Sequence, residues 1–223
     1  GQHLTKELDV LITPPYDVIS PEEQQAFYQS HPFNMIRLVL GKQFPDDDER
    51  NNKHTRASDT LRQWINDGVL VRIDKPALII YQMEFEQPDG GKKRLDGLVA
   101  VVKVDDYGKG KVLPHEKTYL GPKKDQLELL RACKANLTPI HSLFNDDHEK
   151  IYGIYSGFMN NEPDQVTIDS NKNIHRTWII DDENAISSIV EEFAPKSLFI
   201  ADGHHRYETA LAYKREMEQS ASY

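Results

Sequence analysis

The stretch that best indicates the fold is residues 198–211, with the sequence LFIADGHHRYETAL. The apolar run that ends at Ala201 predicts a strand, and Asp202 and Gly203 predict a tight turn that leads into a helix. The first turn of a helix leaves backbone N–H groups without intrahelical partners, and the helix dipole places positive charge there. We therefore expect an anion site at this junction, with positive φ or a close approach at Gly203 and a phosphate contact from Arg206.

The composition is that of a globular, acidic chain of 223 residues. Hydrophobic residues make up 38%, which supports a real core, and the longest apolar runs are far too short to span a bilayer. The formal net charge of −9 argues against binding to a nucleic-acid backbone, because such binding needs a basic face. The single cysteine, Cys133, excludes an internal disulfide and a multi-cysteine zinc site. We therefore expect a cytoplasmic protein with no membrane span and no nucleic-acid partner.

Hydrophobic periodicity predicts a single α/β (α+β) domain over residues 1–223, with a mixed central sheet and flanking helices. Helices are expected at residues 20–31, 50–67, 123–134, 146–158, 181–194 and from 204 onward. Strands are expected at 35–40, at 138–144 and 197–201, and in two hairpins that pair 77–85 with 92–104 and 165–168 with 176–180. Because the last helix runs almost to residue 223, we expect this chain to be the N-terminal portion of a longer protein.

A second polar motif, His115-Glu116-Lys117-Thr118, follows Pro114. Alternate residues of an extended segment share a face, so at most two of the four side chains point into a common cleft. We favour Glu116, as a base or a metal ligand, and Thr118, as a hydroxyl that orients phosphate. The alternative is a polar edge strand or loop held by ion pairs.

A third stretch, Pro14-Pro15-Tyr16-Asp17, forms a rigid loop because two prolines in succession exclude a helix. It ends where Ser20, Pro21 and Glu23 predict a capping box and the start of a helix. Tyr16 and Asp17 therefore either close this loop or face the same cleft as the two later motifs.

The residues 14–20 (PPYDVIS), 115–118 (HEKT) and 202–207 (DGHHRY) together resemble the signatures of a bacterial and archaeal family, domain of unknown function family 1015. The resemblance keeps the order of the signatures and spans nearly the whole chain. That family is similar to the ParB/sulfiredoxin-like superfamily, which includes free-serine kinases, CTP-using ParB proteins and the ATP-using repair enzyme sulfiredoxin. The resemblance implies a nucleotide-binding core in which a Gly-x-His/Arg-Arg turn holds phosphates.

The chain departs from two branches of that superfamily. The place of the catalytic cysteine of sulfiredoxin is occupied by His204, and no DNA-binding helices of the ParB kind are visible. The serine-kinase branch shares Asp-Gly-His-His-Arg. By analogy the resemblance implies nucleotide-dependent phosphoryl transfer to a small polar metabolite such as serine, with ATP or ADP and Mg²⁺ as cofactors.

The motif residues can be given roles in such a reaction. Adjacent helical residues differ by about 100° around the axis, so His204 and His205 cannot both face the ligand equally, and the sequence does not choose between them. The expected catalytic residues are Glu116 as base, His205 as donor to the moving phosphoryl group and Asp202 as a Mg²⁺ or acceptor ligand. The expected phosphate-binding residues are Gly203, His204, Arg206, Thr118 and His115, and the expected cleft residues are Tyr16 and Asp17.

Three other interpretations compete with this one. The chain is a non-catalytic, nucleotide-responsive binding or scaffolding module if ligand binding only closes a cleft. It is a zinc hydrolase if the scattered His and Asp residues hold a metal, but His115-Glu116 is not followed by a second histidine at Tyr119. The last interpretation is a capped strand–helix junction with a buried Arg–Asp pair, an arrangement that is costly without excellent geometry.

Overall fold

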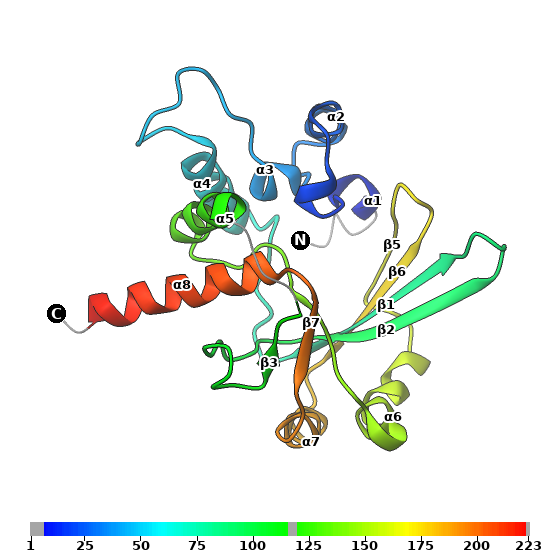
Figure 1. Cartoon of the computed structure of the whole chain (residues 1–223). Helices are drawn as coiled ribbons and strands as arrows, with labels where there is room; N and C mark the ends of the chain where they lie inside the picture. The colour runs from blue at the N-terminus through cyan, green and yellow to red at the C-terminus, as the bar shows by residue number, and fades with distance from the viewer. Residues whose placement is uncertain (1–6, 116–119, 222–223) are drawn as a thin grey trace.

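The computed structural model describes residues 7–115 and 120–221 and has an α/β architecture built on two separate sheets (Figure 1). The larger sheet is antiparallel and has the strand order β2-β1-β6-β5. The smaller sheet has the order β3-β7-β4, in which β7 runs parallel to β3 and antiparallel to β4. The strands are β1 Leu78–Glu86, β2 Lys92–Val99, β3 Val112–Leu113, β4 His141–Leu143, β5 Gln165–Ile168, β6 Ile174–Ile180 and β7 Leu198–Asp202. The α/β class is confirmed, but two sheets replace the single central sheet that the sequence predicts.

The helices form two groups around these sheets. In the first group α5 packs against both α4 and α8, and in the second α6 packs against α7 (Figure 1). The helices are α1 Leu8–Leu11, α2 Pro21–Ser30, α3 Ile36–Val39, α4 Lys53–Asn66, α5 Leu120–Cys133, α6 Lys150–Ser156, α7 Glu183–Phe193 and α8 His204–Ala221, with short 3₁₀ turns η1 Tyr16–Val18, η2 Asp147–Glu149 and η3 Gly157–Asn160. Within the described part of the chain, no helix combines the length and apolar character needed to cross a bilayer.

The helix ends follow the capping signals in the sequence. The Ser20 side chain accepts a hydrogen bond from the Glu23 backbone while the Glu23 carboxylate accepts one from the Ser20 backbone, which is the predicted capping box. Asp182 caps α7 through the Ala185 N–H at 2.7 Å. Gly68, just beyond α4, has the positive φ of 70° expected for a glycine that ends a helix.

The hydrophobic core of the described residues is divided into separate clusters. The largest cluster lies where one face of the larger sheet, with Ile80, Trp178 and Ile180, is covered by α6 and α7 through Ile151 and Ile189. A second cluster joins α3 to α4 and includes the predicted core residue Trp64, and a third, around Ile200, joins the smaller sheet to α8. The smaller sheet therefore depends on the long helix that follows it.

Two predicted strands differ from the structure. Residues 36–39 of the stretch 35–40 form the helix α3. The fully buried Asn34 accepts the Ile36 N–H at 2.9 Å and donates to the Val10 carbonyl at 2.7 Å, which favours a helical turn there. The second strand of the first hairpin, predicted to reach residue 104, ends at Val99, which pairs with Ile79 next to the start of β1.

Candidate functional site

One edge of the smaller sheet brings together His115 of the second motif and the turn at residues 202–206 with which the sequence analysis began. Because β3 and β7 are parallel, their carboxyl ends lie at the same edge, and the antiparallel β4 begins there. His115 follows β3, Asp202 ends β7, and His141 of β4 pairs with Asp202. Polar residues that are far apart in the sequence therefore meet where α8 begins (Figure 1).

The turn between β7 and α8 requires glycine. Gly203 has a φ of 95°, as the sequence predicts, and a Cβ at this position would lie 2.9 Å from Nε of Arg206. The Arg206 guanidinium donates to the Asp202 carboxylate and to the Pro139 carbonyl, and only 12% of its side chain is exposed, against 60% for Asp202. The turn thus holds a fixed positive group beside an open carboxylate.

His204 has a different position from the one expected of a phosphate ligand. Its side chain is 2% exposed, and its Nε2 accepts the His115 backbone N–H at 3.3 Å. The two imidazole rings are perpendicular, with centroids 4.5 Å apart. The placement of His204 therefore favours a positioning role over the predicted phosphate contact. His205 is only partly buried and is the better candidate of the two.

The His115 side chain is exposed and its tautomer is fixed by the sheet. Its Nδ1 lies 2.7 Å from the carbonyl oxygen of Ile200. A carbonyl only accepts hydrogen bonds, so Nδ1 carries the proton and Nε2 of the neutral ring is left with a lone pair. His115 thus presents a group able to accept a proton or, once protonated, to bind an anion.

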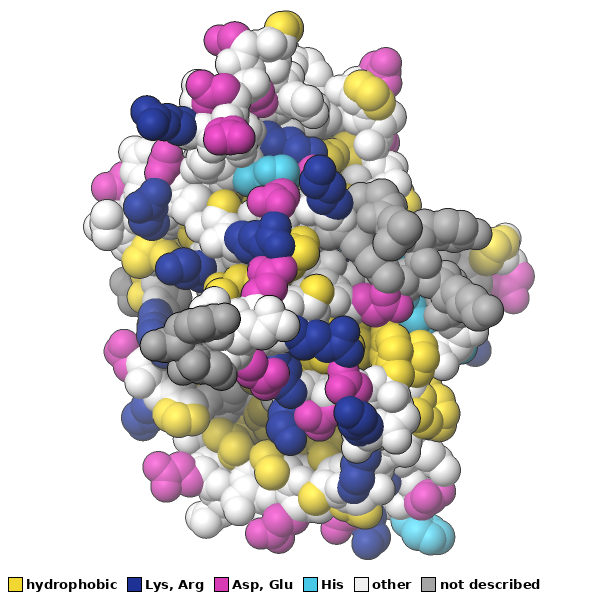
Figure 2. Space-filling model, turned by 60° about the vertical axis from the view of Figure 1, so that its left-hand side comes forward, with side chains coloured by type: hydrophobic (Ala, Val, Ile, Leu, Met, Phe, Trp, Pro, Cys, Tyr) yellow, Lys and Arg dark blue, Asp and Glu magenta, His cyan; other side chains and the backbone are white. Residues whose placement is uncertain are grey.

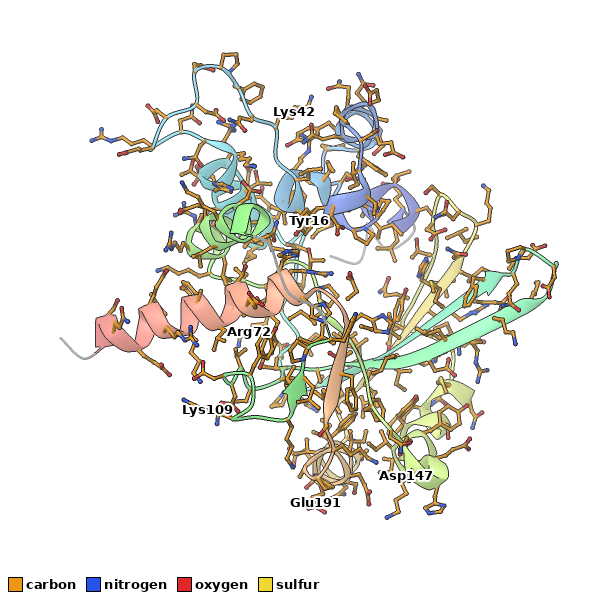
Figure 3. The ribbon with its side chains drawn as sticks, viewed as in Figure 1. Tyr16, Lys42, Arg72, Lys109, Asp147 and Glu191 are labelled. Carbon is orange, nitrogen blue, oxygen red and sulfur yellow. The ribbon has the colours of Figure 1, made fainter. Side chains whose placement is uncertain are left out.

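Tyr16, from the third stretch at residues 14–17, lies within electrostatic range of this turn (Figure 3). Burial raises the pKa of its phenol, the neighbouring Asp17 carboxylate raises that pKa further, and the Arg206 guanidinium partly offsets the shift. Asp202 also contributes to raising the pKa, so Tyr16 lies within electrostatic range of the β7–α8 turn. Asp17 itself is exposed. All three sequence motifs therefore contribute described residues to one region.

A charged cluster that no sequence motif predicts lies beside this region. The Asp125 carboxylate on α5 lies 2.5 Å from Nζ of Lys53 and 3.0 Å from Nε2 of His54, both in the first turn of α4. The hydrogen bond from His54, followed by that from Lys53, lowers the pKa of Asp125 to about 2. Asp125 also acts on the pKa of Tyr16, which connects the cluster to the site. Only a capping signal marks residues 52–54 in the sequence, and the pairing exists because α4 packs against α5.

Two predicted residues lie outside the described part of the chain. Glu116, the expected base, and Thr118, the expected phosphate ligand, fall between His115 and α5, in the segment 116–119 that the structure leaves undescribed. Their roles, and the choice of which face of the segment meets the cleft, stay predictions.

Few of the described side chains are placed to coordinate Mg²⁺. In residues 7–115 and 120–221 no group of three or more His, Cys, Asp or Glu side chains is arranged to hold a metal ion. Mg²⁺ that arrives with a nucleotide, however, needs only one or two protein carboxylates in addition to the phosphates and water. The exposed Asp202 carboxylate at the strand end fits that requirement.

Positive charge on the surface is distributed among acidic residues. On the face seen in Figure 2, Lys and Arg side chains alternate with Asp and Glu and do not gather into one basic area. Arg131 of α5, for example, contacts Glu128 on the same helix and Glu216 of α8, the second at 2.5 Å. The pair with Glu216 joins the two helices that flank the site.

Comparison with known proteins identifies the family. A family model described as "Protein of unknown function (DUF1015)" matches residues 2–223, and a match of this extent shows that the chain belongs to that family. Neither the curated proteins nor the solved structures contain a match to this chain. The relationship to the ParB/sulfiredoxin-like superfamily stays a prediction from the motifs.

Proposed function

We propose that this DUF1015 protein binds ATP or ADP by its phosphates at the β7–α8 junction and transfers a phosphoryl group to a small polar metabolite such as serine. The observation that supports the proposal best is the convergence of Tyr16, His115 and residues 202–206 at one edge of the smaller sheet. Polar residues from three distant segments rarely converge for stability alone, because burying charge without excellent pairing is costly.

The phosphate-binding side of the site consists of the turn and the start of α8. The dipole of this long helix favours an anion at its N-terminus, and Gly203 permits the backbone to approach the ligand closely. Arg206 is fixed by Asp202 and Pro139 and adds a positive charge at the same place. Lys53, paired with Asp125 at 2.5 Å, is a second positive group near the site, since Asp125 acts on the pKa of Tyr16.

The transfer step requires positioning and one proton acceptor. The acceptor hydroxyl gives its proton to Glu116 as its oxygen bonds to the terminal phosphorus, and the bond from that phosphorus to the bridging oxygen of the nucleotide breaks. His205 donates a hydrogen bond to the transferred group, and His115 donates a second one from Nε2 when its ring is protonated. Mg²⁺ held by Asp202 would neutralise charge on the phosphates. A nucleotide-dependent reaction of this kind fits a cytoplasmic protein.

Nucleotide binding is tested by calorimetric titration of ATP, ADP, CTP and GTP, each with and without Mg²⁺. We expect ATP or ADP to bind and Arg206→Gln to weaken binding by at least about tenfold, since a charge-assisted hydrogen bond contributes about 1.5–3 kcal/mol. Arg215→Gln is the matched control, because Arg215 lies on the same helix but contacts Asp106 and is 58% exposed. Equal affinities for the two variants, or no binding of any nucleotide, would contradict the proposal.

Catalysis is tested separately by phosphorus NMR of the reaction with serine and other small hydroxy compounds. We expect a phosphorylated product, and we expect Glu116→Gln to abolish it while nucleotide affinity stays near normal. If the wild-type protein binds a nucleotide but yields no product with any acceptor, the non-catalytic nucleotide-responsive module replaces the kinase as the explanation of the site.

A further inference from the structure

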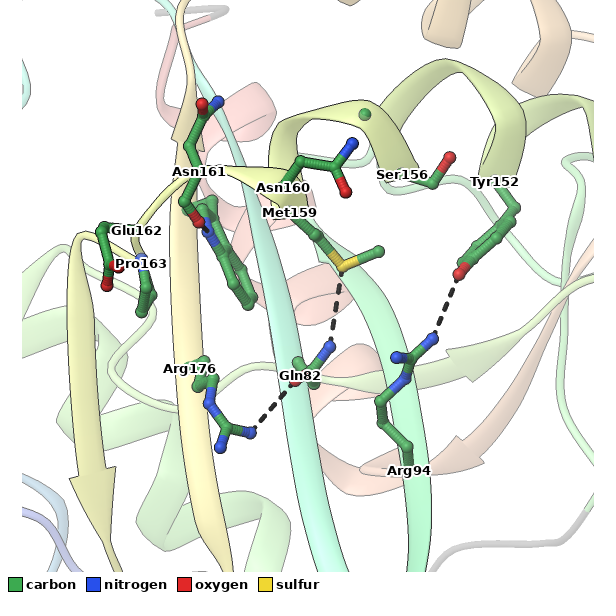
Figure 4. Close-up of a pocket in the computed structure, with 12 residues that line it drawn as sticks. Gln82, Arg94, Tyr152, Ser156, Met159, Asn160, Asn161, Glu162, Pro163 and Arg176 are labelled. Carbon is green, nitrogen blue, oxygen red and sulfur yellow. Dashed lines mark hydrogen bonds between the residues drawn. The ribbon is translucent and has the colours of Figure 1, made fainter.

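A hollow with a volume of about 570 Å³ lies on the larger sheet and contains none of the motif residues (Figure 4). The sheet forms one wall with Gln82 of β1, Arg94 of β2 and Arg176 of β6. The other wall is the segment from α6 to residue 163, including Ser156 and Asn160. Cavities that bind small molecules have volumes of about 300–1,000 Å³, so the hollow is large enough for one.

The register of the sheet explains why the hollow is polar. Gln82 pairs with Asp96 on one side and with Arg176 on the other, so these three side chains form a polar row on one face. Two residues along the same face, Ile80 pairs with Leu98 and Trp178 in the apolar core. The hollow therefore lies where the packed core ends and the polar row begins, and Gln82 there is only 7% exposed.

Hydrogen bonds hold the polar row in place. The Gln82 amide donates to Asp96 at 3.0 Å, and its carbonyl oxygen accepts from Nη1 of Arg176 at 3.2 Å. Arg94 donates from Nε to Asp96 at 3.0 Å and from Nη2 to the Tyr152 hydroxyl at 3.1 Å. Both guanidinium groups are thus oriented by neighbours on the sheet and on α6, on either side of Gln82 (Figure 4).

Each guanidinium keeps unused donors. Among the described residues, Nε and Nη2 of Arg176 and Nη1 of Arg94 have no hydrogen-bond partner. A guanidinium that is fixed in orientation and retains N–H groups matches the two oxygens of a carboxylate. Asp96 already pairs with Arg94 at 2.9 Å and Glu84 with Arg176 at 3.5 Å, so a ligand carboxylate would bind through the N–H donors that these pairs leave unused.

The spacing of the arginines indicates two carboxylates. β2 and β6 lie on either side of β1, and Arg94 and Arg176 pair with residues two positions apart on it, so the backbones at the two arginines are about 12 Å apart. A ligand between these strands that satisfies both guanidinium groups needs an acceptor at each end. We propose that the hollow binds a small aliphatic dicarboxylate, with one carboxylate on Arg176 and the other on Arg94. Ser156 and Asn160 face the same space and offer further polar contacts.

The experiment is an isothermal titration of the protein with succinate and with glutarate, with propionate and inorganic phosphate as comparison ligands. We expect a dicarboxylate to bind at least about tenfold more tightly than propionate or phosphate, because only it reaches both guanidinium groups. Equal affinity for all four ligands, or no heat of binding with either dicarboxylate, would overturn the proposal.

Variants assign the binding to the hollow. Arg176→Gln and Arg94→Gln should each weaken dicarboxylate binding at least about tenfold. Arg62→Gln is the matched control, since Arg62 pairs with Asp59 on the exposed face of α4. Arg94 is 51% exposed, so its variant remains informative if Arg176→Gln does not fold. Arg206→Gln should leave dicarboxylate binding unchanged, which separates this proposal from the nucleotide site. Unchanged binding in Arg176→Gln and Arg94→Gln would refute it.

Discussion

The edge of the smaller sheet and the hollow on the larger sheet are two polar regions built in opposite ways. At the edge, neighbours in sequence hold the turn to which the distant residues come: Gly203 adjoins the Arg206 guanidinium, and Arg206 binds Asp202. In the hollow, Gln82, Arg94 and Arg176 come from three strands and are held by side-chain hydrogen bonds across the sheet and to Tyr152 of α6. The edge therefore depends on backbone conformation and the hollow on side-chain identity.

That difference affects how each region responds to substitution. A residue that fixes backbone conformation changes both the stability and the function of its region when it is replaced. A side chain on a strand that is already paired changes mainly what the region binds. The four experiments below test this contrast, beginning with the largest expected effect.

The largest effect is expected from Ile200→Ala in β7. Ile200 is fully buried in the small core that joins the smaller sheet to α8, so its removal leaves a cavity there. We expect a loss of about 2–5 kcal/mol in the free energy of unfolding, measured with urea. A loss below about 1 kcal/mol would mean that the smaller sheet does not depend on this core.

The next effect compares two glycines, one in the turn at the edge and one on β2, the strand that carries Arg94. Gly203→Ala introduces strain at a φ of 95° and a contact of 2.9 Å with Arg206, whereas a Cβ at Gly97 of β2 meets no atom within 4 Å. We expect Gly203→Ala to lower the free energy of unfolding by about 1–3 kcal/mol and Gly97→Ala to change it by less than about 1 kcal/mol. Similar losses in both variants would remove the distinction between the two regions.

The two histidines of the turn should differ as well. His204→Leu removes the side chain that accepts the part-buried hydrogen bond from the His115 backbone N–H. We therefore expect a loss of about 1–2 kcal/mol in the free energy of unfolding, measured with urea. His205→Ala, at the adjacent and less buried position, should cost less in stability but more in nucleotide affinity. The reverse ranking would show that His205 is the positioning residue.

The smallest effect concerns the pH dependence contributed by Asp125. Its pKa is lowered from 3.8 to about 2 in the folded protein, so its contribution to stability is present above the unfolded value and is lost as the pH falls from about 5 toward 2. Because the side chain is 42% exposed, we expect only about 1 kcal/mol. Urea unfolding at pH 6 and pH 3.5 should therefore show a smaller acid loss for Asp125→Asn than for the wild type.

Local signals predicted much of the fold. The capping box at Ser20, the cap at Asp182 and the positive φ at Gly203 depend on a few neighbouring residues, and the structure confirms all three. Residues 35–40 were misjudged because a side chain beyond the apolar run, the buried Asn34, redirects the chain. The split into two sheets depends on which distant strands pair, and strand patterns alone do not encode it.

The candidate site was predictable to the same extent. The strand–turn–helix pattern predicts the polar turn, whereas the sequence leaves open whether Tyr16 and Asp17 close a loop or face the same cleft; the pKa of Tyr16 places it in electrostatic range of the turn. The burial of His204 and the pairing of Lys53 with Asp125 depend on helix packing and could not be read from spacing. The hollow carries no sequence signal, because Arg94 and Arg176 are ordinary polar positions in alternating strands.

The strand order of the smaller sheet sets a time order for synthesis. β3 and β4 do not pair with each other; both pair with β7, which follows the other six strands of the described residues. A ribosome adds about 5–20 residues per second, so residues 112–143 wait several seconds before residues 198–202 emerge. During that interval β3 and β4 have no partner in the sheet. The larger sheet is complete once β6 has left the ribosome, and the motif site therefore assembles after the larger sheet.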